Sequence, residues 1–389
     1  MNRLLEWLAL LPWLVMLVTL PLLVLRRVKL SAFPAPAPED APLVSIVVPA
    51  RNEAVNISVC LASLYSTNYP RFEIIVVDDG SVDGTGDIVR ILADHADGNL
   101  ELVAGAPLPD GWLGKPWACW QGAQRARGEL LLFTDADTRH DELLLGHAVG
   151  ALQANGVDLV TILPRQLMVG FWERVVLPQI FGLLAIRYHD LRRVNTTGKA
   201  QDVIANGQFM LIRQAAYRAL GGHEALRGEV VEDQRMAQRL VESGRRIFVG
   251  HAPELMETRM YRSLGGILEG WTKNLAIGSR RASPGWAAPI VPWLVALFLL
   301  AVWVLPPATL LLTFTTAQAA GLRSWSLAAT LICLVFWLLM CRGMRVPLRY
   351  AAAFPVGAAI TAGLFIRSAL RGPRVEWKGR QYDMRPDNP

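Results

Sequence analysis

Residues 130–138 read LLLFTDADT, an apolar run followed at once by two aspartates one residue apart. A short apolar run of this kind is typical of a buried strand. Asp135 and Asp137 then leave the sheet together at the carboxyl end of that strand, where parallel α/β sheets bind their ligands. Carboxylate oxygens suit hard divalent cations such as Mg²⁺ and Mn²⁺. The run therefore predicts a site where a cation and a diphosphate meet.

Predicted strands and helices alternate around this run. The pattern indicates strands at 43–48, 73–77, 100–103 and 130–133, and helices at 54–64, 84–96 and 117–126. Such alternation predicts an α/β fold with a mostly parallel, Rossmann-like sheet covered by helices on both faces. We expect this domain to span residues 43–262. The proline-rich residues 31–42 before it predict a semi-rigid linker.

Two polar motifs close the first two predicted strands. Residues 49–53 (PARNE) follow the first strand, and residues 77–85 (VDDGSVDGT) follow the second. Asp78 and Asp79, at a strand end, can accept hydrogen bonds from the ring nitrogens of a base. A Rossmann dehydrogenase would carry Gly-x-Gly-x-x-Gly after its first strand. PARNE stands there instead, which disfavours that class.

In residue identity, order and spacing, these motifs resemble those of the family 2 glycosyltransferases of GT-A fold. The resemblance implies a GT-A domain whose nucleotide-binding residues include Pro49, Ala50, Glu53, Asp78 and Asp79. Residues 112–118 (WLGKPWA) are similar to a lysine-containing segment of the same family. Lys115 would there neutralise a phosphate or hold a ribose hydroxyl.

The same resemblance assigns roles to three aspartates. Asp135 would face the ribose and Asp137 would bind Mg²⁺ or Mn²⁺, with Asp135 as a further candidate ligand. Asp233, in residues 231–235 (VEDQR), would be the general base that takes the proton of an acceptor hydroxyl. Glu232 would have an orienting role in the site or would cap the helix. The alternative is that this acidic pair only stabilises the amino terminus of a helix.

Two acceptor-side segments also resemble the family. They are residues 206–209 (NGQF) and residues 221–223 (GGH), in which His223 replaces the usual aromatic residue. His223 would either touch the substrate or be an ordinary loop residue.

One motif departs from the family pattern. Relatives carry Gln/Arg-x-x-Arg-Trp after the base, whereas the arginine is missing before Trp271. The resemblance places Trp271 and Lys273 beside the donor, and Lys273, Arg259 or Arg262 could supply the lost charge. Residues 270–274 (GWTKN) are more similar to the hopanoid-associated and carotenoid glycosyltransferase branch, and more distantly to ceramide glucosyltransferases.

The amino-terminal end of the chain predicts a membrane anchor. Residues 7–25 are uncharged, and Arg26, Arg27 and Lys29 follow. We expect a transmembrane anchor within residues 1–30, with its basic flank in the cytoplasm. A cleaved signal peptide is the alternative.

The carboxyl-terminal end predicts further spans. Residues 282–322, 324–341 and 350–366 are uncharged. We expect three or four spans within 282–367, because 282–322 could hold one span and an apolar linker or a hairpin at Pro306-Pro307. The basic tail, 368–389, favours a cytoplasmic carboxyl terminus and five spans in total.

Two shorter apolar stretches look interfacial. Residues 175–186 are too short to cross a bilayer and predict an interfacial helix or a buried one. Residues 263–281 predict a second interfacial helix before the late spans.

Composition narrows the class of protein. Hydrophobic residues make up 52% of the 389 residues, above the roughly 45–50% usual for soluble domains. The net charge of +6 forms no basic stripe with interleaved aromatic residues in the polar domain, so we expect no nucleic-acid partner. Attraction to anionic lipid is the simpler explanation of the charge. The four cysteines show no metal-binding spacing.

These observations lead to one main hypothesis. We expect an integral protein of a bacterial-type cell membrane whose catalytic domain is cytoplasmic. It would move one sugar, with inversion, from a nucleotide-diphosphate sugar, a UDP-sugar by resemblance, to a membrane lipid hydroxyl. A polyprenyl-phosphate sugar synthase and a catalytically silent lipid-binding or scaffold protein remain alternatives. The sequence does not indicate an oligomeric state.

Overall fold

The computed structural model describes residues 10–19, 27–95, 98–316, 321–370, 374–377 and 380–383. The chain divides into two compact units, each assembled from separate segments. The helical unit comprises Met1–Arg26, Met168–Asp190 and Tyr261–Pro373. The sheet unit comprises Arg27–Leu167, Leu191–Met260 and Arg374–Pro389.

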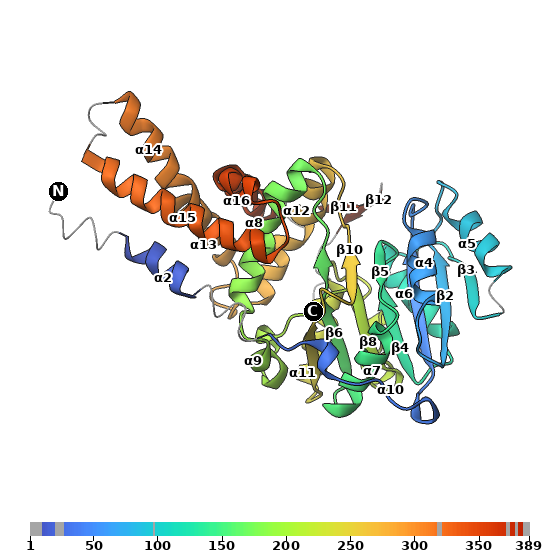
Figure 1. Cartoon of the computed structure of the whole chain (residues 1–389). Helices are drawn as coiled ribbons and strands as arrows, with labels where there is room; N and C mark the ends of the chain where they lie inside the picture. Colours follow the sequence, from blue (N-terminus) through green and yellow to red (C-terminus); the bar gives the residue numbers. More distant parts are fainter. Residues whose placement is uncertain are drawn as a thin grey trace. The chain divides into compact units, whose positions relative to one another are not determined.

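A seven-stranded sheet, in the order β3-β2-β1-β4-β8-β6-β9, forms the centre of the sheet unit (Figure 1). Its strands are β1 (Val44–Ala50), β2 (Phe72–Asp78), β3 (Leu100–Ala104), β4 (Leu130–Thr134), β6 (Leu159–Leu163), β8 (Phe209–Arg213) and β9 (Ile247–His251). Strand β1 pairs in parallel with β2 and β4, and β2 with β3. Strand β8 runs antiparallel to β4 and β6, and β6 pairs in parallel with β9. The predicted mostly parallel sheet is confirmed.

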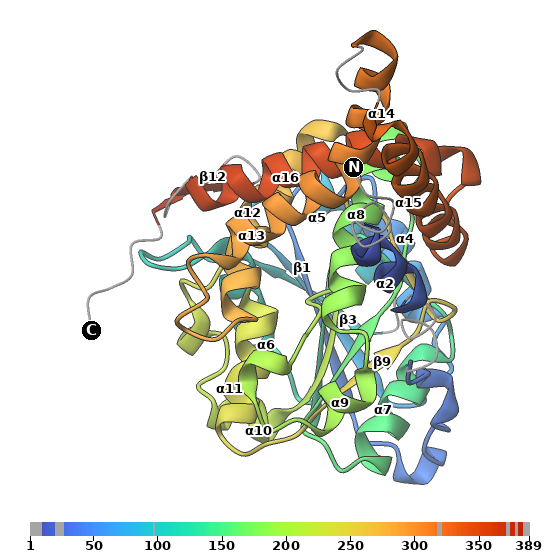
Figure 2. The ribbon, with the colours of Figure 1, turned by 90° about the vertical axis from the view of Figure 1, so that its left-hand side faces the viewer.

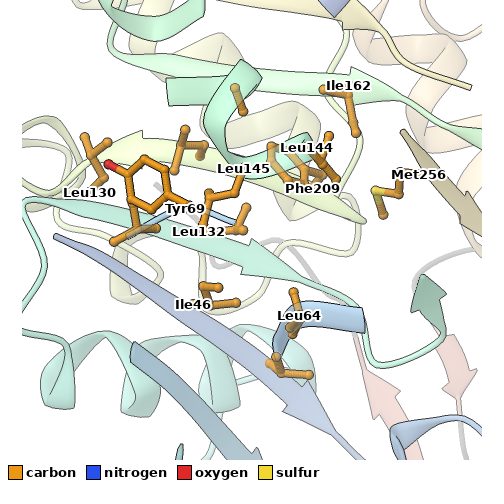
Figure 3. Packing of buried hydrophobic residues seen from close by; sticks show 14 of the residues in the cluster. Ile46, Leu64, Tyr69, Leu130, Leu132, Leu144, Leu145, Ile162, Phe209 and Met256 are labelled. Atoms are coloured by element: carbon orange, nitrogen blue, oxygen red, sulfur yellow. The ribbon is translucent and has the colours of Figure 1, made fainter. Parts of the chain in front are cut away.

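Helices cover this sheet. They are α4 (Ile57–Tyr65), α5 (Thr85–Ala93), α6 (Gly114–Arg125), α7 (Leu144–Ala154), α9 (Leu191–Thr196), α10 (Gln214–Ala219) and α11 (Glu232–Glu242). Residues of α4, α5 and α7 share one buried cluster with alternate residues of the strands. Figure 3 shows Leu132, Leu144 and Phe209 in this cluster. On α6, a Cβ at Gly122 would collide with Val47 Cγ1, so glycine lets α6 pack closely against β1.

A second, small sheet adjoins the turn after β4. It consists of β5 (Thr138–His140), β10 (Met256–Thr258) and β7 (Arg165–Gln166), in the order β5-β10-β7. Strand β5 begins one residue after Asp137, so the two sheets hold the two ends of the turn that carries both aspartates.

The proline-rich linker is packed onto the sheet unit. His147 Nδ1 on α7 lies 2.6 Å from the main-chain oxygen of Phe33, and the Phe33 ring packs edge-on against Phe248, with centroids 5.1 Å apart. A Cβ at Gly150 would collide with the main-chain oxygen of Pro34. Small residues on α7 therefore give the linker a docking surface, a long-range contact that composition alone does not reveal.

The helical unit consists of α2 (Leu11–Thr19), α8 (Phe171–Arg187), α12 (Leu264–Arg281), α13 (Val291–Leu299), a π-helical segment (Leu300–Val304), α14 (Leu305–Thr315), α15 (Arg323–Gly343) and α16 (Phe354–Leu370). Among the described residues, three helices are long and apolar enough to cross a membrane: Val291–Thr315, Arg323–Gly343 and Leu348–Leu370. Helix α16 packs against α8, α12 and α13 (Figure 2).

The late apolar region does not turn at Pro306-Pro307. Both prolines lie in the first turn of α14, which continues directly from the π segment. A proline inside a continuous helix removes a main-chain hydrogen bond, and the helix changes to the π-helical pattern just before Pro306. Residues 291–315 therefore form one continuous helical segment, which is compatible with the single-span alternative for residues 282–322. Of the expected amino-terminal span, residues 7–9 and 20–25 lie outside the described residues.

The shorter apolar stretch, 175–186, lies within α8. Its residues Val175, Val176 and Ile180 are buried among helices of the helical unit. The amide of Gln179 donates to the main-chain oxygen of Phe354 on α16 at 3.2 Å. This part of the chain follows the buried-helix alternative. In the basic tail, β11 (Arg374–Trp377) pairs with β12 (Arg380–Asp383), and the rest lies outside the described residues.

Candidate active site

Strand order brings the first two polar motifs together. Ala50 and Asp78 are register partners at the ends of β1 and β2. The main-chain N–H of Asp79 donates to the main-chain oxygen of Ala50 at 2.8 Å. Pro49, Ala50, Asp78 and Asp79 therefore lie together at one edge of the sheet, as expected for residues that surround one ligand.

The loops after β1 and β2 interlock. Three main-chain N–H groups of the first loop donate to side-chain oxygens of the second: Asn52 to Ser81 at 2.9 Å, Glu53 to Thr85 at 2.8 Å, and Ala54 to Asp83 at 2.9 Å. Asn52 has a left-handed backbone, with φ of 53°. Asparagine tolerates this conformation better than most residues. The two loops therefore form one pre-shaped surface.

Arg51 is a residue whose role the sequence did not reveal. Its Nη1 donates to the main-chain oxygens of Asp79 at 2.5 Å and Gly80 at 3.2 Å. Asp79 as a whole residue is only 5% exposed. Arg51 thus holds the second loop by its main-chain oxygens.

Lys115 joins three segments that are far apart in the chain. Its Nζ lies 2.7 Å from Asp135 Oδ1, after β4, and 3.1 Å from Glu232 Oε1, on α11. Burial alone would lower the pKa of Lys115, but the charges of Asp135 and Glu232 outweigh it and raise the pKa well above the usual value. Lys115 is therefore a cation that bridges the predicted donor side and the predicted acceptor side.

Asp233 lies beside this ion pair, in the first turn of α11. Its Oδ2 accepts from the N–H of Gly207 at 2.7 Å, and its Oδ1 accepts from the N–H of Gln234 at 2.7 Å. Burial, and then the charge of Glu232, raise the pKa of Asp233 to about 6, against the opposing effects of Lys115 and the two N–H groups. A carboxyl with this pKa is ionised near neutral pH yet a stronger base than an ordinary aspartate.

Gly207 leaves space at the centre of this group. A Cβ at position 207 would lie 2.9 Å from Lys115 Nζ and 3.2 Å from Asp233 Oδ2. The segment 206–209, which resembled the acceptor side of the family, therefore contacts both charged groups. A side chain at 207 would require Lys115 or Asp233 to move.

Asp135 and Asp137 lie on the turn between β4 and β5, and both are half-buried. Among the described residues, no group of three or more His, Cys, Asp and Glu side chains is arranged to hold a metal ion. Mg²⁺ keeps several waters and uses one or two carboxylates together with substrate phosphates. A pair of carboxylates on one turn fits that smaller ligand set.

Two further predicted site residues belong to the helical unit. Trp271 and Lys273 lie on α12 in the helical unit, where Trp271 is buried against Phe181, with ring centroids 5.9 Å apart. Their contact with a donor stays a prediction. In the sheet unit, Trp112 and Trp117 pack against one another, with centroids 5.0 Å apart.

The side chain of His223 packs in the core of the sheet unit. It is buried, its Nδ1 lies 2.9 Å from the Tyr217 hydroxyl, and its ring packs edge-on against Phe133, with centroids 4.7 Å apart. Burial lowers the pKa of His223 to about 3. The position of His223 in the turn after Gly221 and Gly222 follows the loop-residue alternative, and the turn directs its side chain into the core.

Comparison with known proteins agrees with this arrangement. Residues 45–221 match the protein-family model described as "Glycosyl transferase family 2". A 4,4'-diaponeurosporenoate glycosyltransferase of Staphylococcus aureus is 28% identical over 64% of this chain. The match spans 65% of that relative's own length. The enzyme of the same name from Staphylococcus haemolyticus is 27% identical over 69% of this chain and 71% of its own.

A solved structure shows the same fold. A mannosyltransferase from Pyrobaculum calidifontis, in complex with GDP-mannose and Mn²⁺, superimposes with a TM-score of 0.52 and 20% identity. The superposition covers 87% of this chain and 89% of that one. Taken with the sheet order, these comparisons show that residues 45–221 resemble family 2 glycosyltransferases and that the sheet unit has the GT-A fold.

Proposed function

We propose that this protein is an inverting glycosyltransferase. It moves one sugar from a nucleotide-diphosphate sugar, a UDP-sugar in the first instance, to a hydroxyl of a membrane lipid. The observation that carries the proposal is the convergence of Lys115, Asp135 and Glu232 beside Asp233. These side chains come from three segments and combine a cation for a diphosphate with a raised-pKa carboxylate for an alcohol.

In this mechanism Asp233 accepts the proton of the acceptor hydroxyl. An alcohol is a poor nucleophile near neutral pH, and a positioned base typically contributes about 10²–10⁴-fold to such a step. The N–H groups of Gly207 and Gln234 fix the direction of the carboxylate. The activated oxygen attacks the anomeric carbon from the side opposite the diphosphate, which inverts the configuration.

Asp137, with Asp135 as a second ligand, would hold Mg²⁺ or Mn²⁺. A bound dication stabilises the negative charge of a leaving diphosphate as a Lewis acid. Lys115 contributes a further positive charge at the same place. Glu53, Asp78 and Asp79 place the nucleotide on the interlocked loops.

The acceptor is proposed to be an apolar molecule of the membrane. The curated relatives are named for transfer to 4,4'-diaponeurosporenoate. Three helices of the described chain are long and apolar enough to cross a bilayer. We further propose that the sheet unit is cytoplasmic and that Trp271 and Lys273 contribute to the donor site.

The closest alternative uses an acceptor that is already ionised, either a polyprenyl phosphate or a carboxylate. Such an acceptor needs no general base. A silent lipid-binding protein is the second alternative, and it would release no nucleotide at all.

One experiment separates these functions. Membranes that contain the full-length protein are incubated with a panel of sugar nucleotides, and nucleotide release and the mass of total lipid are measured. Asp233→Asn should keep donor binding and lower transfer by about 10²–10⁴-fold. Asp87→Asn, an exposed partner of Arg90 on α5, is the matched control. Full transfer by Asp233→Asn would favour the ionised acceptor and contradict the proposed base.

A further inference from the structure

The turn that carries Asp135 and Asp137 is closed at its base by three buried polar side chains. Thr134 ends β4 and Thr138 begins β5, and their hydroxyl oxygens lie 3.2 Å apart. Nε2 of His140 lies 3.1 Å from the Thr134 oxygen and 3.0 Å from the Thr138 oxygen. All three residues are buried. The histidine ring therefore sits where the two ends of the turn meet.

The hydrogen atoms in this cluster can be assigned from their partners. A threonine hydroxyl has a single proton to donate. Thr134 donates to the main-chain oxygen of Gln208 at 2.8 Å, and Thr138 donates to that of Asp135 at 2.7 Å. Because both hydroxyl protons are used, the contact of the ring with the two oxygens needs a hydrogen on Nε2. His140 is thus a shared donor to both threonines.

His140 is itself held by neighbouring elements. The main-chain N–H of His140 donates to the Ser63 hydroxyl, on α4, at 3.0 Å. The ring lies next to Phe209 of β8, with centroids 6.0 Å apart. Burial lowers the pKa of His140 to about 3, so the ring is neutral and needs no counter-ion. Elements on both sides of the turn therefore fix the donor nitrogen.

We propose that His140 is a positioning residue for the aspartate pair. By donating from Nε2 to Thr134 and Thr138, it fixes the direction in which Asp135 and Asp137 leave the sheet. The effect on the turn follows from these contacts, and the effect on a cation with a nucleotide diphosphate rests on the proposed function. Groups that orient metal ligands typically change affinity by about 10–100-fold when removed.

Two substitutions separate the donor from the volume of the ring. His140→Phe fills the space without an N–H group, and His140→Gln restores an N–H donor at a similar reach. His223→Phe is the matched control, because His223 is also a buried neutral histidine but bonds Tyr217 instead of the turn. All variants are made in the full-length protein and purified in detergent.

Amide hydrogen exchange over residues 134–140 and binding of Mn²⁺ in the presence of UDP are measured. His140→Phe should speed exchange of this segment and weaken Mn²⁺ binding about 10–100-fold, while His140→Gln stays within about threefold of wild type. His223→Phe should change neither quantity.

Other results would overturn the proposal. Unchanged exchange in His140→Phe, equal loosening in His223→Phe, or no rescue by His140→Gln would each remove the role of His140 in the turn. Faster exchange with unchanged Mn²⁺ binding would remove the link to the cation. If the wild-type protein bound no Mn²⁺ with UDP, the proposed function would be contradicted, and exchange alone would decide whether His140 holds the turn.

Discussion

At the scale of single residues, the two acids at the start of α11, Glu232 and Asp233, have different partners. Glu232 bonds Lys115, whereas Asp233 is held by main-chain N–H groups and has a pKa raised to about 6. Both carboxylates also lie at a helix amino terminus, where the dipole favours negative charge. The structural and catalytic interpretations of the pair are therefore compatible.

This pKa predicts a pH dependence for the transfer reaction. A general base works only when deprotonated, so the rate at saturating donor should fall as pH drops through about 6 and level off above it. Initial rates measured on detergent-solubilised protein between about pH 5 and pH 8 test this point. A rate that stays flat across this range would argue against a titrating base.

Lys115 should influence the pH at which the rate of transfer falls. Its charge lowers the pKa of Asp233, so Lys115→Met should move the acidic limb to higher pH and weaken donor binding. Lys199→Met, at an exposed lysine of the sheet unit, is the matched control and should leave the profile in place. A limb that moved to lower pH would mean that Lys115 acts in another way.

The sequence predicted the charged residues of the site better than the groups that hold them. Asp135, Lys115 and Asp233 stand in motifs whose order along the chain is informative. Arg51, Gly207 and His140 act through contacts between distant segments, or through main-chain atoms that no side-chain pattern encodes. The burial of the His223 side chain is hidden from the sequence for the same reason, since only the fold shows where a glycine turn directs the next side chain.

At the scale of elements, the close packing of α6 on β1 places Lys115. Helix α6 begins at Gly114, three residues before the predicted start, so Lys115 is in its first turn. A Cβ at Gly122 would collide with Val47 and approach Val77 Cγ2 to 3.2 Å. The position of the lysine thus depends on a glycine two turns away.

Gly122→Ala should destabilise the sheet unit. Overpacking of a well-packed core typically costs about 1–3 kcal/mol. We expect a lower unfolding midpoint in denaturant and weaker donor binding, as α6 shifts outward. Gly198→Ala, where no heavy atom lies within 4 Å of the added Cβ, is the control and should be close to neutral. Equal midpoints for the two variants would refute the packing argument.

At the scale of the whole molecule, composition and hydropathy predicted the apolar carboxyl-terminal helices well. Uncharged runs at 324–341 and 350–366 correspond to α15 and α16. The run at 282–322 was ambiguous, because two adjacent prolines can end a helix or begin one. The structure shows that the helix continues through both prolines, for which the sequence has no local signal.

The three apolar helices predict how the protein fractionates. It should remain with membranes after washing with high salt or alkaline carbonate and dissolve in detergent, since exposed Leu, Val and Phe side chains cover these helices. Immunoblots of the fractions measure this. Release by salt alone would indicate that the net charge of +6, rather than insertion, attaches the protein.

Helix α8 has a practical consequence for anyone who wants a shortened, soluble protein. It lies in the chain between β7 and β8 of the sheet unit, yet its buried residues belong to the helical unit, where it packs on α16. A truncation before residue 291 would remove α16 and expose the apolar residues of α8 that pack against it. Crystallisation or screening in aqueous buffer would therefore require redesign of residues 171–187 as well as removal of the residues from 291 onward.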